Sequence, residues 1–348
     1  MQVLADGSVK ADDGRILYFS LPRFISDICR GDRCFICGAQ RGEKGFNDEH
    51  VIPDWILREL NLHSRFIDLP NRSLRRYSQY RIPCCNDCNR MLGSKIEEPV
   101  SKIIKGGMTS LAEHLRSQGP WLIFIWMGLL FFKTHYKDRE LFQHLDRREG
   151  TGKIADAYSW EDLHHLHCVI RSFYTHVELT PRALGSVFAC QARTDSLFDP
   201  FDYGDSLPTQ TLLLRFRDIV LIVVLNDSCA VYSTVKDNLY PRIKGPLSPL
   251  QARELMARHA YLNAVIESRP IFYSNFEGSD YKISADIDEH VRLVDPVPEL
   301  YGELLTRACA DMVKLSGALN IEEVLTNLKN GKWTFLFRPD GSFESNAV

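Results

Sequence analysis

Short apolar runs with few charges dominate the second half of the chain and predict β-strands. The turn-like segments Arg217-Asp218 and Asn226-Asp227-Ser228 separate three consecutive runs, which are therefore predicted to form an antiparallel meander. A terminal hairpin around Asp340-Gly341 is predicted over 333–343. The predicted strands cover 16–20, 186–191, 211–216, 219–225, 229–234 and 271–274, of which 211–216, 219–225 and 229–234 make the meander.

Longer segments with helical periodicity lie between and after these runs. Gly119-Pro120 divides the first of them, and Ser159 is a candidate N-cap for the second, with Glu161 and Asp162 in its first turn. Helices are predicted over 108–144, 159–171, 249–267, 299–315 and 321–328. The mixture of helices and antiparallel strands indicates the α+β class.

The strongest apolar run spans 121–132 and is twelve residues long. A helix that crosses a membrane needs roughly 20 apolar residues, so this run is predicted to be a buried helix of the core. No membrane partner is expected.

Composition favours a folded protein, because 45% of the 348 residues are hydrophobic. Ten cysteines without an apolar leader fit a reducing cytosol better than a disulfide framework, so a cytoplasmic location is expected. Gly106-Gly107 breaks the helical pattern. The expected organisation is a lead-in over 1–29, a compact module over 30–105 and an α+β domain over 106–348.

Four cysteines form two closely spaced pairs, Cys34-x2-Cys37 and Cys85-x2-Cys88. Two such knuckles bring four thiolates onto one tetrahedral ion, which predicts a structural zinc site. Cys29 and Cys84 are alternative ligands, but the two-residue spacer favours Cys34 and Cys85. The remaining cysteines lie among apolar residues and are expected in the core: Cys168, Cys190, Cys229 and Cys309.

Polar residues that suit a second metal stand beside this pattern. Glu49 and His50 lie between the cysteine pairs, and Asn89 directly follows the last cysteine. A carboxylate and an amide oxygen suit a hard cation such as Mg²⁺, and a neutral imidazole can take a proton from water near pH 7. Because neighbouring residues of a strand face opposite ways, Glu49 and His50 can share one site only if the backbone is irregular.

The segments CFICG, DEHVIPDW and CCNDCNRMLGSKIEE resemble the zinc-bearing branch of the HNH, or ββα-metal, endonucleases. The resemblance covers about residues 30–105. It implies a hairpin with the acid–histidine pair packed on a helix with the asparagine, and a zinc that joins the hairpin to that helix. Glu49 and Asn89 would then hold the divalent cation, His50 would activate water, and the helix would cover 89–98 and end before Pro99.

One position departs from the family pattern. An asparagine that orients the histidine usually lies shortly before the second cysteine pair, where this chain has Tyr80-Arg81-Ile82-Pro83. Asn71 is the nearest candidate for that role, and a backbone carbonyl is the alternative.

Charge is distributed unevenly along the chain. The net charge is −3, yet ten basic residues face five acids between Arg58 and Lys105. Arg72, Arg75 and Arg76, together with Arg90, are therefore predicted to contact the phosphates of DNA. A solvated loop is the alternative interpretation of this cluster.

A histidine cluster, His164, His165 and His167, lies on the helix predicted over 159–171. Only the first and last have a spacing that suits a ligand pair, and no acid is placed to join them. An ordinary amphipathic helix is favoured over a metal site.

The resemblance implies a metal-dependent DNA endonuclease, and similar modules in bacterial restriction and antiphage systems suggest a role in defence. Residues 106–348 would then select the substrate, bind a protein partner or hold the enzyme inactive. Two alternatives stay open: a non-catalytic zinc module that binds nucleic acid or protein, and an RNase that uses the same site.

Overall fold

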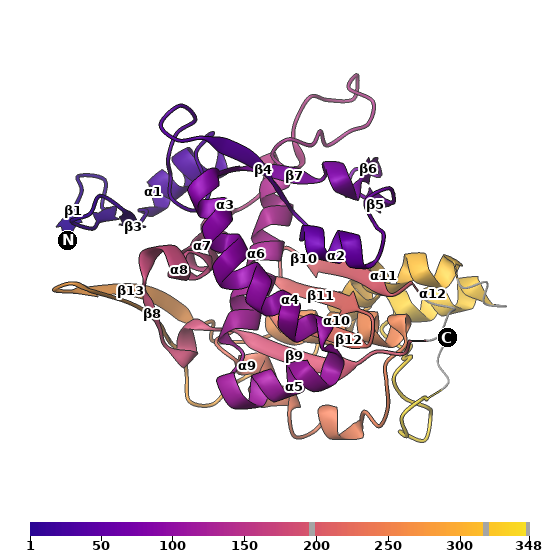
Figure 1. Ribbon diagram of the computed structural model, residues 1–348. Helices are drawn as coiled ribbons and strands as arrows, with labels where there is room; N and C mark the ends of the chain where they lie inside the picture. The colour runs from indigo at the N-terminus through magenta and orange to yellow at the C-terminus, as the bar shows by residue number, and fades with distance from the viewer. Residues whose placement is uncertain (195–198, 316–319, 346–348) are drawn as a thin grey trace. The chain divides into compact units, whose positions relative to one another are not determined.

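The computed structural model describes residues 1–194, 199–315 and 320–345 of the chain (Figure 1). Helices and strands are mixed throughout these residues, which confirms the expected combination of α and β structure. The chain divides into two compact units that are discontinuous in sequence. Unit 1 comprises Met1–Lys102, Ile125–Ala183 and Phe272–Ser284; unit 2 comprises Ile103–Phe124, Leu184–Ile271 and Ala285–Val348.

Unit 1 begins with a small antiparallel sheet in the order β1-β2-β3. Ser20 then caps a short helix by accepting a hydrogen bond from the Arg23 backbone N–H. The elements of this segment are β1 (Gln2–Val3), β2 (Val9–Lys10), β3 (Ile16–Tyr18), α1 (Leu21–Arg23) and the π-helical turn η1 (Phe24–Cys29).

Two antiparallel hairpin-like pairs follow, one nested inside the other along the chain. The outer pair joins β4 to β7 with Phe46 opposite Cys85 and His50 opposite Arg81, and the inner pair joins β5 to β6. The elements are β4 (Phe46–His50), α2 (Asp54–Glu59), β5 (Phe66–Asp68), β6 (Leu74–Arg76), the 3-10 turn η2 (Tyr77–Gln79) and β7 (Arg81–Cys85).

A helical run starts directly after β7 and does not stop at Pro99, which corrects the predicted end of the helix. It consists of α3 (Asn86–Leu92), the π-helical turn η3 (Gly93–Glu97) and α4 (Glu98–Lys105). Proline lacks an N–H and clashes with the preceding turn of a regular α-helix. The wider π-turn before Pro99 relieves the clash, and the position of Pro99 near the start of α4 makes the missing N–H less costly.

The apolar run forms helix α6 (Trp121–Lys137), as predicted, and its residues from Ile125 onward form the centre of unit 1. Phe132 is fully buried and stacks on Phe35 with 6.1 Å between ring centroids. The rest of unit 1 contains η4 (Ile154–Ala157), η5 (Trp160–Leu163), α7 (His164–Ile170), α8 (Ser172–Thr175), β8 (Glu178–Leu179) and η6 (Pro181–Ala183). Strands β13 (Ile271–Glu277) and β14 (Asp280–Asp286) extend β8 into a sheet of order β13-β14-β8.

Unit 2 is built on a four-stranded antiparallel sheet of order β10-β11-β12-β9. Two of its strands, β11 and β12, are buried along their whole length, which explains their unbroken apolar sequences. The strands are β9 (Ser186–Gln191), β10 (Phe201–Ser206), β11 (Thr211–Phe216) and β12 (Ile219–Val224).

The prediction of a third meander strand over 229–234 is wrong, because this segment forms helix α9 (Ala230–Val235). Asp227, fully buried, accepts hydrogen bonds from the Val231 backbone N–H and from Ser186, and these bonds organise the start of the helix. The strand β10, which pattern analysis missed, pairs with β11 instead.

Helix α10 (Pro249–Ala264) packs on β11 and β12. A capping box starts it, in which Ser248 accepts from the Gln251 N–H and the Gln251 side chain accepts from the Ser248 N–H. The remaining elements of unit 2 are α5 (Gly107–Gln118), η7 (Tyr240–Arg242), α11 (Pro298–Leu315) and α12 (Ile321–Lys329). The predicted terminal hairpin is reduced to one bridge between Phe337 and Phe343.

Candidate metal centre and its surroundings

The sulfur atoms of Cys34, Cys37, Cys85 and Cys88 all lie within 4.8 Å of one another. The Cys37 and Cys85 sulfurs are 3.6 Å apart, and all four residues are buried. Four thiolates at this spacing suit one tetrahedral ion, and no position is left for water or substrate. The predicted four-cysteine group is confirmed, and it could hold a metal such as zinc in a structural role.

Local backbone geometry brings the first cysteine pair together. The Gly38 N–H donates to the Cys34 carbonyl at 2.8 Å, and Gly38 adopts φ +77°. A Cβ at this position would lie 2.6 Å from the Phe19 ring, so the turn requires glycine for both conformation and space. The second pair spans the end of β7 and the first turn of α3, so a bound ion would join the hairpin strand to the helix.

The two alternative ligands, Cys29 and Cys84, are buried but are not members of the group. Burial raises the pKa of the Cys29 thiol. The membership of the group agrees with the choice of Cys34 and Cys85 as ligands.

The acid of the acid–histidine pair, Glu49, is 8% exposed and forms an ion pair with a lysine far along the chain. Lys133 of α6 places its Nζ 2.9 Å from Glu49 Oε1 and also donates to the His50 carbonyl at 2.8 Å. A third contact of 3.3 Å joins the same Nζ to Glu97 Oε1. Lys133 is 1% exposed, so one buried ammonium serves two carboxylates and one backbone carbonyl.

Glu97 is the last residue of the π-helical turn η3, and its side chain is 20% exposed. Burial raises the pKa of Glu97 to about 7, against the opposing effect of Lys133. The proximity of Glu49 adds to the increase. Lys133 and the two carboxylates therefore form a triad with more negative than positive charge when fully ionised.

His50 is engaged by different partners. Strand β4 pairs regularly with β7 through Glu49 and His50, so the irregular backbone expected at this pair is absent and the two side chains point to opposite faces of the strand. The His50 Nε2 accepts a hydrogen bond from Arg81 Nε at 3.1 Å and lies 3.9 Å from Asp54 Oδ1. Desolvation and then the Arg81 charge lower the pKa of His50, which is thereby held neutral at pH 7.

Asn89, the predicted amide ligand, projects from α3 to strand β4. Its Nδ2 donates to Asn47 Oδ1 at 2.8 Å. This bond does not use the side-chain oxygen Oδ1 of Asn89. Asn71 does not orient His50. Its Oδ1 accepts from the Ser73 N–H and hydroxyl, and its Nδ2 donates to the Phe142 carbonyl.

The predicted phosphate-binding arginines lie on two elements. Arg75 and Arg76 belong to β6, Arg72 lies in the turn before it, and Arg90 projects from α3. Arg72, Arg76 and Arg90 are exposed and Arg75 is half-buried. They provide positive charge at the surface of unit 1.

The histidine cluster is structural. His164 bonds to the Phe19 carbonyl at 2.7 Å, His165 to that of Ala183 at 3.0 Å, and His167 to that of Phe35 at 2.7 Å. Burial lowers the pKa of all three, and of His165 to about 4. In the part of the chain that the structure describes, the cysteine group is the one cluster of candidate ligands that meets the 4.8 Å spacing.

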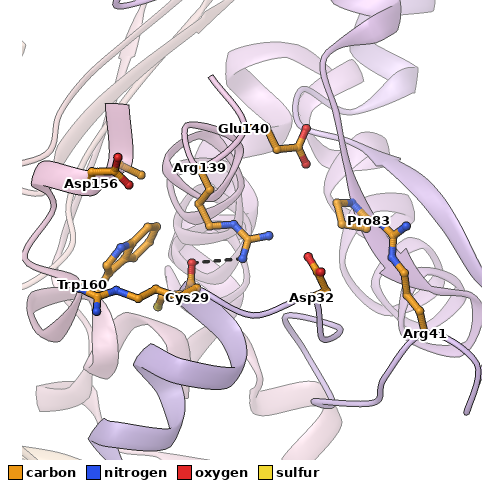
Figure 2. Close-up of a pocket in the computed structure, with 10 residues that line it drawn as sticks. Cys29, Asp32, Arg41, Pro83, Arg139, Glu140, Asp156 and Trp160 are labelled. Carbon is orange, nitrogen blue, oxygen red and sulfur yellow. Dashed lines mark hydrogen bonds between the residues drawn. The ribbon is translucent and has the colours of Figure 1, made fainter. Parts of the chain in front are cut away.

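A surface pocket of about 450 Å³ lies in unit 1 (Figure 2). The Arg139 guanidinium at its centre donates to the carbonyls of Ile28, Cys29 and Gly31, as Figure 2 shows for Cys29. Three arginines and three carboxylates share its wall, so its charges favour no class of ligand: Arg30, Arg41, Arg139, Asp32, Glu140 and Asp156.

Sequence analysis missed the residues that engage the acid–histidine pair, above all Lys133 and Arg81. Lys133 follows the apolar run 121–132 directly, and a lysine next to so apolar a run was a usable signal for a buried ion pair. No helix among the described residues has the length and hydropathy that crossing a bilayer requires. Neither the protein-family models nor the curated proteins nor the solved structures contain a match to this chain.

Proposed function

We propose that the chain is a metal-dependent endonuclease that hydrolyses phosphodiester bonds of DNA, as its resemblance to the HNH enzymes implies. The observation that carries the proposal is the order β4–β7–α3 around the cysteine group. Strand β4 supplies Glu49 and His50, β7 leads into Cys85 and Cys88, and α3 supplies Asn89. One structural ion would thus support all the elements that bear the proposed site.

Glu49 and Asn89 would hold the divalent cation through oxygen atoms. The bonds to Lys133 and Asn47 engage Glu49 Oε1 and Asn89 Nδ2, whereas the atoms suited to a hard cation include Glu49 Oε2 and Asn89 Oδ1. Such a cation, when bound, would stabilise the charge that develops on the phosphate. Lys133 would keep the Glu49 carboxylate in one orientation.

His50 would act as the general base, which requires β4 to adopt an irregular backbone when cation and substrate bind, since Glu49 and His50 face opposite ways in the regular strand. The hydrogen bond from Arg81 requires a lone pair on Nε2, so it holds the imidazole with its proton on Nδ1. A substrate phosphate competes for the Arg81 guanidinium, because arginine binds phosphate strongly. Its arrival would release Nε2 to take a proton from water.

DNA would be held by Arg72, Arg75, Arg76 and Arg90, whose charges complement a polyanionic backbone. One such site cuts one strand, so a single chain would nick and two chains or two events would cut both strands. A role in bacterial restriction or antiphage defence follows from the resemblance, with unit 2 available to choose the substrate or bind a partner.

A second function is favoured by one observation. The buried ion pair with Lys133 already neutralises the Glu49 carboxylate. This is the arrangement expected of an acid that stabilises the fold and does not bind a cation. A zinc module that binds nucleic acid or protein without catalysis would retain this pair permanently. It would bind DNA equally well with or without His50.

Incubation of the protein with supercoiled plasmid and, in turn, Mg²⁺, Mn²⁺ or Ni²⁺ tests the proposal. Cleavage that needs an added cation and is lost in Asn89→Ala and Glu49→Gln, with zinc content unchanged, is the expected result. Binding without cleavage under every metal would support the non-catalytic module. Parallel digestion of RNA separates an RNase from a DNase, since preferential RNA cleavage would contradict the DNA assignment.

A further inference from the structure

The hairpin of β5 and β6 presents an unusual outer face. Phe66 lies opposite Arg76 and Asp68 lies opposite Leu74 in its register. Directly opposed residues share a face of an antiparallel pair, and so do residues two apart on one strand. Phe66, Asp68, Leu74 and Arg76 therefore project on one side, and Ile67 and Arg75 on the other.

Two large apolar side chains on this face are open to solvent. Phe66 is 53% exposed and Leu74 is 67% exposed. They occupy diagonal positions on the same face of the hairpin, and an aromatic side chain can reach its diagonal neighbour. Single exposed hydrophobic residues, in contrast, are normal on proteins. Neighbouring exposed apolar side chains indicate a surface that contacts a partner.

Cations flank the apolar surface. The Arg76 guanidinium lies 5.8 Å from the centre of the Phe66 ring, and Arg72 is exposed in the turn that joins the strands. Asp68 is the one acid among residues 65–76, which also contain Arg65 and Arg75. The partner that complements this hairpin is therefore anionic as well as able to receive apolar side chains.

The tip of the hairpin is held firmly. Asn71 closes the turn through its two bonds to Ser73, and its Nδ2 donates to the Phe142 carbonyl at 2.8 Å. Leu69, 4% exposed, anchors the same turn in the interior of unit 1. Phe66 and Leu74 are thus presented on a supported ribbon, which lowers the entropy lost on binding.

We propose that this hairpin enters a groove of duplex DNA and presses Phe66 and Leu74 against a base step, while Arg72 and Arg76 contact the flanking phosphates. Apolar wedges beside cations are a known way to unstack and kink a duplex. A second copy of the chain fits less well, because a symmetric contact would bring the arginines of two hairpins together. The inference rests on the proposed function in taking DNA as the substrate.

Fluorescence of 2-aminopurine placed in a duplex tests the wedge, because unstacking of the base increases its emission. The measurement uses the full chain with Ca²⁺ in place of Mg²⁺, and DNA binding is followed separately by anisotropy. The variants are Phe66→Ala/Leu74→Ala for the wedge, Arg72→Asn/Arg76→Gln for the phosphate contacts and Leu145→Ala as a control. Leu145 is 65% exposed in the same unit but lies outside the hairpin.

The wild type and Leu145→Ala are expected to increase the emission. Phe66→Ala/Leu74→Ala should lose that increase and bind roughly tenfold more weakly, with an unchanged dependence on salt. Arg72→Asn/Arg76→Gln should reduce the salt dependence by about two ion contacts. A folded Phe66→Ala/Leu74→Ala variant that binds and unstacks like the wild type would overturn the proposal.

Failure of this inference and failure of the proposed function give different results. Hairpin-dependent unstacking without cleavage in Mg²⁺ would support the wedge and contradict the nuclease. Cleavage with no change in 2-aminopurine emission would support the nuclease and contradict the wedge. If sedimentation shows that the double variant merely separates a dimer while DNA binding persists, the hairpin is an interface between copies and the wedge is refuted.

Discussion

Lys133 Nζ lies 2.9 Å from Glu49 Oε1, although 84 residues separate the two along the chain. The same ammonium bonds to the backbone carbonyl of His50, so one side chain of helix α6 holds both the Glu49 carboxylate and the backbone beside it. A buried lysine is stable only with compensating partners, and Glu97 provides a further one. The core helix thus sets the position of the proposed site.

Replacement of Lys133 by methionine should destabilise the protein severely. The variant keeps the length of the side chain but leaves Glu49 and Glu97 without their cation. Removal of one partner of a buried ion pair costs about 3–5 kcal/mol. Urea denaturation of the zinc-loaded protein measures the free energy of unfolding.

Lys137→Met is the matched control for this prediction. Lys137 lies one turn further along α6, is also buried, and is paired with Glu140, whose side chain is 46% exposed. Water can solvate the Glu140 carboxylate when its cation is removed, so the free energy of unfolding should fall by only about 1 kcal/mol. Equal losses of unfolding free energy in the two variants would contradict a particular stabilising role of Lys133, Glu49 and Glu97.

The chain should contain one zinc ion, held by the four cysteines. Cys88→Ser is expected to lose the metal and most of the folded signal, because the binding energy of a structural zinc is part of the folding energy. Cys84→Ser should retain one ion, since Cys84 is buried next to Cys85 but stands outside the group. Elemental analysis by mass spectrometry with circular dichroism checks both, and zinc loss from Cys84→Ser alone would reassign the ligands.

The buried His259 should make stability depend on pH. Desolvation lowers its pKa to about 4, below the value of about 6.5 that it has in the unfolded chain. The unfolded state therefore binds more protons between these values, and stability is full above pH 6.5 and falls as pH decreases toward 4. The contribution is up to about 3 kcal/mol.

His259→Gln removes the titrating group and should flatten this dependence. Denaturation at pH 7, 6 and 5 measures the slope for both proteins, and the contribution of the zinc site cancels in the difference. Identical slopes for the wild type and the variant would contradict the assigned cause.

The sequence predicts features that depend on local patterns. The spacing of Cys34, Cys37, Cys85 and Cys88 identified the metal group, and the apolar run 121–132 identified the core of α6. Both signals lie in short stretches where residue type alone limits the structure.

Features that depend on distant contacts were missed or mistaken. Residues 229–234 have the composition of a strand, but Asp227 and Ser186 start a helix there through bonds that span 41 residues. Pro99 appeared to end a helix, and the π-turn before it could not be anticipated. The pairing of Lys133 with Glu49 depends on the packing of α6, which no local pattern encodes.

Cleavage of supercoiled plasmid by His50→Ala in Mg²⁺ tests the central claim most directly. The control is His144→Ala, which alters a partly exposed histidine of the same unit that bonds to Glu149. The proposed mechanism predicts that His50→Ala retains zinc and fold but loses at least about a hundredfold in cleavage rate, the contribution typical of a general base. His144→Ala should cleave like the wild type, and full activity in His50→Ala would contradict the mechanism.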